Sequence, residues 1–274
     1  MTHHFLLREQ APLSAEQWSE IDQVVTQTAR RQLVARRLLP IFGPLGAGVT
    51  ALPLRKLSPP QDAAIDLAGR EQALIGVEEA DFIPIPLIYC DFLIHWREME
   101  RSRQFGLPLD LSPVVAAAVA VARREDELIF HGHHDLGHIG ILNAPGRTTM
   151  PLGDWNRPGA AFDNVVAAVT KLSSLGFFGP FAIITSPGLY ATTNRVFDNT
   201  GVLEIDQIRN LAQAGFFLSS VLPEPTALIV SVGAENLDLV IAQDIITAYL
   251  QVENLNHYFR VLEAVAVRIK RPQA

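Results

Sequence analysis

Four histidines lie close together in the segment FHGHHDLGHIG, which covers residues 130–140. Imidazole nitrogens are common ligands of zinc and other transition metals. His131, His133, His134 and His138 are therefore the first candidates for chemistry in this chain. On a helix, the last two would share one face because they are four residues apart. The segment raises the hypothesis of a metal-dependent enzyme.

The residues around the histidines argue against that hypothesis. Asp135 is the only carboxylate inside the segment, and no H-E-x-x-H arrangement occurs anywhere in the chain. The preceding helix is expected to end at Gly132, and Gly137 and Gly140 are typical of a turn-rich connector. The sequence thus favours exposed connector histidines and predicts no metal site. A metal-dependent enzyme remains an alternative.

Other catalytic signatures are also absent from the sequence. It contains no G-x-S-x-G, no P-loop and no G-x-G-x-x-G after a predicted strand. The lone Cys90 sits in an apolar run, where an inert buried thiol is expected. The acidic run at residues 125–127 falls on a predicted helix, which favours a solvated or salt-bridged face. We predict no catalytic residue.

Composition places the chain among soluble proteins. Its 274 residues are 49% hydrophobic, enough for a sizeable core. The net charge of −7 gives no broad electrostatic footprint for nucleic acid. A single cysteine suits a reducing compartment, no secretory signal is visible, and the most apolar stretch, residues 114–122, is too short to cross a bilayer. We expect a cytoplasmic protein without a membrane or nucleic-acid partner.

Two helices stand out among the elements that must position any site. The first begins with Ser14 as its cap and Gln17 completing a capping box. Its apolar stripe is Trp18, Ile21, Val25, Ala29 and Leu33. Such a stripe either packs on its own core or serves in part as a docking face. The second helix, from Pro113 to Phe130, is apolar on all sides in its first half and is expected to be the internal spine of a domain.

Between these helices, residues 43–81 show a different residue pattern, with short alternating runs. Val49 to Leu54 and Gln72 to Val77 are expected to be two strands of a long hairpin, with Pro59 and Pro60 excluding helix between them. An isolated two-stranded ribbon is marginal in water. The arm therefore needs a neighbour, either elsewhere in the fold or on another subunit.

After Gly140 helices and strands alternate, so the chain is predicted to be an α+β protein. The expected helices are residues 162–175, 189–197 and 205–214, and the expected strands are residues 181–185, 227–232, 237–241 and the alternating stretch after 257.

Six blocks in order along the chain resemble the encapsulins, the shell proteins of bacterial and archaeal nanocompartments. The blocks are APLSAEQWSEID with RRQLVARRLLPIFGPLGAG, then IPLIYCDFLIHWREME, EDELIFHGHHDLGHIG, MPLGDWNRPGAAF, GVLEIDQIRNLA and NHYFRVLEAVAVRIK. They cover nearly the whole chain, and the resemblance is to the myxobacterial-type shell.

The resemblance implies the major capsid fold of the tailed phage Hong Kong 97, with a peripheral domain, an axial domain and an extended loop. The implied boundaries are residues 1–42 for the cargo-docking helix and the start of the peripheral domain, 43–81 for the extended loop, 82–138 for the peripheral domain with its spine helix, 139–222 for the axial domain, and 223–274 for strands that return to the peripheral domain.

The function implied by the resemblance is structural. Copies of the chain would close into an icosahedral shell around cargo enzymes, either a ferritin-like protein or a dye-decolorising peroxidase, each bringing a C-terminal targeting peptide. The shell itself would need no cofactor, and any iron would be held by the cargo. A tailed-phage or prophage capsid subunit is the alternative on the same fold. The residues implied for cargo-peptide binding are Ile21, Val25, Ala29, Arg36 and Ile246.

The resemblance also suggests two further sites. The segment from Phe197 to Glu204 resembles the loop around a five-fold pore, with Asp198, Thr200 and Glu204 as pore-lining residues, although a capped connector between helices has the same composition. Trp96 resembles a tryptophan that stacks a flavin on the shell, and the alternative is ordinary aromatic packing.

Overall fold

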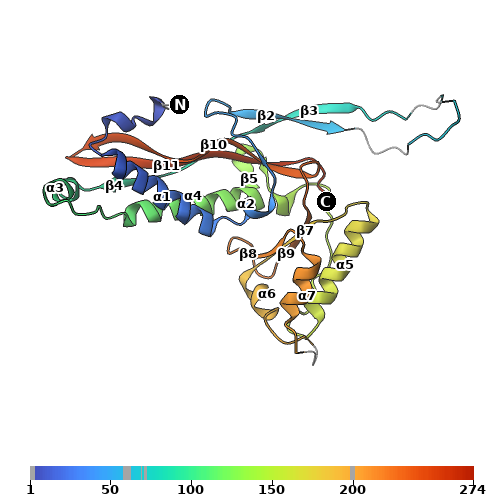
Figure 1. The fold of residues 1–274 in the computed structure, drawn as a ribbon. Coiled ribbons are helices and arrows are strands. Elements are labelled where there is room, and N and C mark those ends of the chain that lie inside the picture. Colours follow the sequence, from blue (N-terminus) through green and yellow to red (C-terminus); the bar gives the residue numbers. More distant parts are fainter. Residues whose placement is uncertain (1–3, 58–62, 69, 71–72, 198–200) are drawn as a thin grey trace.

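The computed structural model describes residues 4–57, 63–68, 70, 73–197 and 201–274. It combines an elongated larger unit, a smaller unit below it and a long projecting ribbon (Figure 1). The helices are η1 (His4–Leu6), η2 (Arg8–Gln10), α1 (Ala15–Gln32), α2 (Ala35–Leu38), α3 (Trp96–Phe105), α4 (Ser112–His131), η3 (His134–Leu136), η4 (Ile141–Asn143), α5 (Ala160–Ser174), α6 (Pro187–Thr192) and α7 (Glu204–Leu211). The strands are β1 (Ile41–Phe42), β2 (Ala51–Leu57), β3 (Val77–Pro84), β4 (Leu87–Ile94), β5 (Gly132–His133), β6 (His138–Ile139), β7 (Phe181–Thr185), β8 (Gly215–Leu218), β9 (Ala227–Ser231), β10 (Leu237–Glu253) and β11 (Asn256–Ile269).

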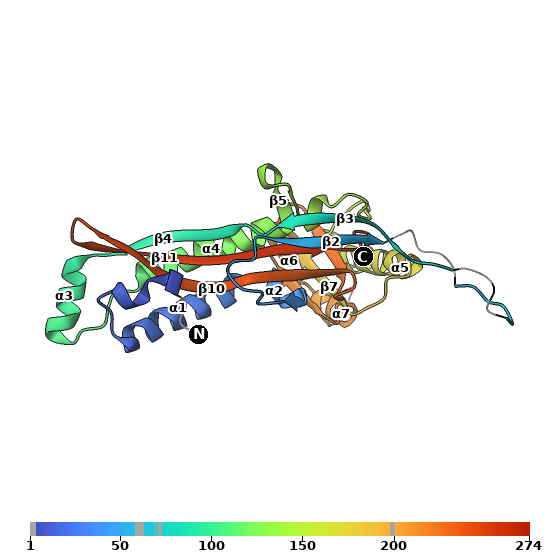
Figure 2. The same cartoon turned by 90° about the horizontal axis from the view of Figure 1, so that it is seen from above.

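The larger unit is a four-stranded sheet in the order β1-β10-β11-β4, with α1 and α4 on one face (Figures 1 and 2). The long strands β10 and β11 pair antiparallel along their whole length, and β4 pairs antiparallel with β11. Three register shifts interrupt the β10–β11 ladder. Bulges of this kind bend a strand pair and increase its local twist.

The core of this unit forms where both helices meet the sheet. Ser14 caps α1 as expected: its hydroxyl accepts from the Gln17 amide at 3.2 Å, and its own amide donates to the Gln17 side chain at 2.9 Å. Phe259 of β11 is fully buried, stacked on Phe92 and in edge contact with Trp18. Aromatic contacts of this geometry add to the area they bury, so α1 is fixed to the sheet by its own apolar stripe.

The smaller unit is a three-stranded sheet, β8-β7-β9, surrounded by α5, α6 and α7. β7 is buried at every position, as expected for a central strand that is covered on both faces. β9 pairs antiparallel with β7. The predicted boundary after residue 222 is therefore too early, because the strand at 227–231 belongs to this unit and the chain returns to the larger sheet only at β10.

The ribbon consists of β2 and β3, which pair antiparallel from Ala51 opposite Pro84 to Leu57 opposite Val77. The prediction of a hairpin is confirmed, but both strands lie further along the chain than residues 49–54 and 72–77. Ile83 packs at the root of the ribbon against buried sheet residues such as Ile85 and Val240. Beyond the root the ribbon extends away from the body (Figure 1). No helix in the described part of the chain is both long and apolar enough to span a bilayer.

Candidate functional site

The apolar stripe of α1 is part of the subunit core. Ile21, Val25 and Ala29 are exposed by no more than 1% of their surface, and they pack among residues of α4 and the sheet. A groove that binds a peptide must have accessible side chains. Burial in the folded subunit favours the alternative of core packing for these three residues, and their assignment to a cargo groove stays a prediction.

Ile246 lies on the other face of the sheet. Successive side chains of a strand alternate between faces, and Val261 packs in the core with α1 whereas its neighbour Leu262 packs with Ile246. The half-buried Ile246 is covered there by Leu6 of the N-terminal segment. The face of the sheet on which Ile246 lies could not be predicted from the sequence, because the bulges in β10 change which side chains of that strand point to each face.

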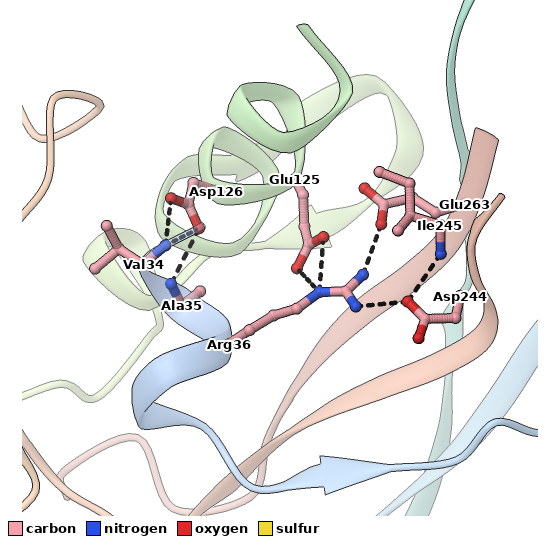
Figure 3. Close-up of polar contacts among 8 residues, drawn as sticks. All are labelled: Val34, Ala35, Arg36, Glu125, Asp126, Asp244, Ile245 and Glu263. Carbon is pink, nitrogen blue, oxygen red and sulfur yellow. Dashed lines mark hydrogen bonds and ion pairs between the residues drawn. The ribbon is translucent and has the colours of Figure 1, made fainter. Parts of the chain in front are cut away.

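Arg36 lies at the centre of a buried ion network (Figure 3). Its guanidinium reaches Glu125 of α4 at 2.8 Å, Asp244 of β10 at 2.6 Å and Glu263 of β11 at 2.6 Å. The Glu125 and Glu263 side chains are fully buried, whereas Asp244 is largely exposed. Arg36 therefore ties α2 to α4 and to both long strands, and its donors are occupied within the subunit rather than offered to a peptide.

Asp126 completes this region from the next position of α4 (Figure 3). Its carboxylate accepts hydrogen bonds from the Val34 and Ala35 amides at 2.9 and 3.0 Å. These amides begin α2, where backbone donors lack helical partners. The expectation of a solvated or salt-bridged face at residues 125–127 is thus only partly met. The carboxylates of Glu125 and Asp126 have partners, but both side chains are buried rather than solvated.

Burial controls the electrostatics of the network. Desolvation, followed by the nearby charge of Glu125, raises the pKa of Glu263 well above its usual value. The Glu263 Oε1 atom is buried without a hydrogen-bond partner among the described residues. Desolvation also raises the pKa of Asp126 to about 7, against the two backbone hydrogen bonds that lower it. Burial disfavours the charged guanidinium, but Glu125 and Glu263 outweigh it and raise the pKa of Arg36.

Of the three residues predicted to line a pore, Asp198 and Thr200 lie outside the described residues. Glu204 is fully buried: it pairs with Arg195 at 3.1 Å and accepts a hydrogen bond from the Phe162 amide at 3.0 Å. Its carboxylate holds α7, α5 and the preceding loop together. Burial and ion pairing favour a structural role for Glu204, and its place among the pore-lining residues stays a prediction.

Trp96 begins α3 at the far end of the larger unit and is half-buried. It lines an open cavity of about 860 Å³ together with Met99, Leu255 and His257. The Arg97 guanidinium lies 5.4 Å from the indole ring. A planar ring system needs one accessible aromatic face and apolar walls. Met99 and Leu255 supply apolar lining, but Glu100 and Arg103 line the same cavity. The His95 ring also stacks against the indole at 6.1 Å. Flavin stacking on Trp96 therefore stays a prediction.

Two of the four connector histidines bond to carbonyl groups in different parts of the fold. His131 Nε2 lies 2.6 Å from the Val221 carbonyl in the smaller unit, and His138 Nε2 lies 2.8 Å from the Pro84 carbonyl at the root of the ribbon. His134 is exposed as expected, but His138 is buried, and burial lowers its pKa. In the described part of the chain, no group of three or more His, Cys, Asp or Glu residues has an arrangement suited to a metal ion.

Glycine is required where this connector folds back on itself. A Cβ atom on Gly132, which has a positive φ of 72°, would lie 2.3 Å from the His138 carbonyl oxygen. One on Gly140 would lie 2.3 Å from the Gly132 nitrogen. The segment therefore joins the spine helix, the ribbon and the smaller unit through tight backbone packing.

Comparison with known proteins decides the family. A family model described as an encapsulating protein for peroxidase, Linocin_M18, matches residues 2–266. The chain belongs to this encapsulin family. It is 45% identical over 271 residues to the type 1 encapsulin shell protein EncA of Myxococcus xanthus, covering 98% of this chain and 94% of the relative. It is 40% identical over 262 residues to a diheme-cytochrome-encapsulin shell fusion protein of Kuenenia stuttgartiensis, covering 96% of this chain and 72% of the relative.

Solved structures of similar fold confirm the predicted capsid architecture. A virus-like particle from Pyrococcus furiosus superposes with a TM-score of 0.76 at 20% identity, covering 94% of this chain and 96% of the other. The capsid of the myovirus XM1 superposes with a TM-score of 0.57 at 13% identity, covering 84% and 85%. The encapsulin therefore shares its fold with tailed-phage capsid proteins, while the family match favours the shell protein over the phage alternative.

Proposed function

We propose that this encapsulin subunit closes with copies of itself into a hollow icosahedral shell that encloses cargo enzymes in the cytoplasm. The observation that carries the proposal is the ribbon formed by β2 and β3. Its outer part exposes large apolar side chains: Ile65 is 93% exposed and Leu74 75%. Surfaces of this kind on a soluble chain are typical of interaction sites. A neighbouring subunit would cover them, and closed symmetry would give every ribbon the same partner.

The cargo proposal draws on the relatives. The Kuenenia shell protein is fused to a diheme cytochrome, and a relative from Pyrococcus furiosus, 25% identical over 73% of this chain and 54% of its own length, is a ferritin-like-encapsulin shell fusion. The chain described here would capture a separate cargo protein through a C-terminal targeting peptide on a ferritin-like enzyme. The shell would need no cofactor, and iron would be held by the cargo.

Cargo capture must use accessible groups, which the buried stripe of α1 does not supply. We place it on the exposed flank of α1 together with the adjoining strand β10. Asp22 and Asp244 place carboxylates in this region, each paired with an arginine of the same subunit, and Ile246 adds a half-buried apolar side chain on the other face of the strand. Many weakly bound copies held in one shell reinforce each other.

Negative-stain electron microscopy of the purified protein tests the shell. Hollow closed particles are expected, and in size-exclusion chromatography they should elute at a smaller volume than any small ring. A monodisperse monomer or small ring at the concentrations used for imaging would overturn the proposal. Co-expression with a ferritin-like protein, with and without its C-terminal peptide, tests the cargo separately, since only the intact protein should co-purify with the particles.

A further inference from the structure

The residues before α1 form a strap around one edge of the larger sheet. This N-terminal strap, residues 4–10, starts on the sheet face opposite α1 and passes the edge of β10 before the chain enters α1 (Figures 1 and 2). β10 pairs with β11 throughout, but β1 reaches it only at Leu239 and Val240. Along residues 244–253, no described strand pairs with the other edge of β10. An edge of this kind accepts an added segment of chain.

Two side chains anchor the strap. Leu6 is 3% exposed and packs on the sheet against Ala248 and Leu262. Arg8 makes two hydrogen bonds of 2.7 Å to the Asp22 carboxylate of α1, and its Nε donates to the Thr247 carbonyl of β10 at 2.9 Å.

Arg8 also stacks on the core, because its guanidinium lies 4.5 Å from the centre of the Trp18 ring. The bidentate pair with Asp22 and the aromatic contact together form a site that is specific for arginine.

The strap is not wholly buried. Phe5 and Leu7 are 49% and 38% exposed, and the Arg8–Asp22 pair is partly open to solvent. A segment of chain that carries the same two anchors could therefore occupy this site in place of the strap.

We infer that the N-terminal strap is an internal ligand of the cargo-docking surface, and that it competes with cargo segments carrying an aliphatic residue and, two positions later, an arginine. The inference rests on the proposed function, because it requires that cargo docks beside α1. The cargo's aliphatic side chain would take the place of Leu6, and its arginine would pair with Asp22. The amount of cargo bound by the shell then depends on the fraction of time that the strap is detached from this surface.

The test uses a reporter that carries the strap's own sequence. A fluorescent protein ending in HFLLREQ, the sequence of residues 4–10, is co-expressed with the full-length shell protein, and the ratio of reporter to shell is measured in purified particles. A double variant of the shell protein, Leu6→Ser with Arg8→Ala, releases the strap. In the unmodified shell protein, the apparent affinity for the tag is reduced in proportion to the fraction of subunits whose strap is open. Releasing the strap should therefore raise the ratio of reporter to shell about fivefold or more.

Three controls keep the inference falsifiable. Arg31→Ala removes an exposed arginine of α1 and should leave loading unchanged. Changing the arginine of the tag to glutamate should abolish loading, and so should Asp22→Asn in the shell. If the double variant yields no particles, Arg8→Lys, which keeps the charge but loses the bidentate contact, should raise loading to a smaller extent.

Unchanged or lower loading in intact particles of the strap variants would overturn the inference and show that the strap only stabilises the fold. In that case the shell function stands, because the particles themselves have formed. Failure of the unmodified protein to form particles would instead contradict the proposed function.

Discussion

Replacing Arg36 with leucine should destabilise the subunit strongly. The substitution removes the common partner of two fully buried carboxyl groups, Glu125 and Glu263, and of the exposed Asp244. Removing one partner of a buried ion pair costs about 3–5 kcal/mol. Whole domains are stable by only about 5–15 kcal/mol. Arg36→Leu should therefore lower the guanidinium midpoint of unfolding by a large part of its value, whereas Arg37→Leu, at an exposed neighbour, should cost about 1 kcal/mol or less.

The stability lost in the Arg36→Leu variant should also depend on pH. Burial raises the pKa of Glu263 above its unfolded value, so its contribution to stability is full below pH 4 to 5 and is lost as pH rises through the raised pKa. Without Arg36 no cation offsets the buried negative charge, so the penalty of Arg36→Leu should be larger at pH 9 than at pH 5. Adding Glu263→Gln should recover part of it at the higher pH.

The assay is guanidinium unfolding of purified protein followed by tryptophan fluorescence, at one protein concentration, since assembly makes apparent stability depend on concentration. The reasoning is refuted if Arg36→Leu and Arg37→Leu cost the same. It is also refuted if Glu263→Gln recovers nothing at pH 9.

Three other substitutions test separate parts of the account. Leu67→Asp with Leu74→Asp, in the exposed part of the ribbon, should prevent particle formation in light scattering while leaving a folded subunit by circular dichroism; normal particles would contradict a role in assembly. Glu204→Ala should cost about 3–5 kcal/mol by leaving Arg195 without its buried partner, and a change in ion passage without loss of thermal stability would support a pore role instead. Trp96→Ala should abolish quenching of added flavin mononucleotide fluorescence by the particles, and equal quenching by both proteins would place the flavin elsewhere.

Much of the fold could be predicted because local chemistry specifies it. The capping box at Ser14 and Gln17 begins α1 in the structure, and Pro113 lies in the first turn of α4, which ends at Gly132 as expected. The hairpin of the ribbon is predictable from short alternating runs separated by prolines that exclude a helix. Its register was missed, since register depends on pairing between strands rather than on either strand alone.

The candidate docking residues could not be predicted in the same way. A stripe that packs on a core and one that binds a peptide have the same spacing, so the burial of Ile21 follows only from the position of α4. The role of Glu263 was missed because a single glutamate in the alternating strand β11 gives no sign of the arginine it will meet. The strap was missed as well, because Leu6 and Arg8 form no recognisable motif until β10 and α1 are placed beside them.

Cryo-electron microscopy of the purified particles, at a resolution that traces the backbone, tests the central claim most directly. The account predicts a closed shell in which the β2–β3 ribbon of each subunit lies on a neighbouring subunit, with Ile65 and Leu74 covered at that contact. A subunit that is stable alone, with its ribbon folded back on its own sheet, would contradict it.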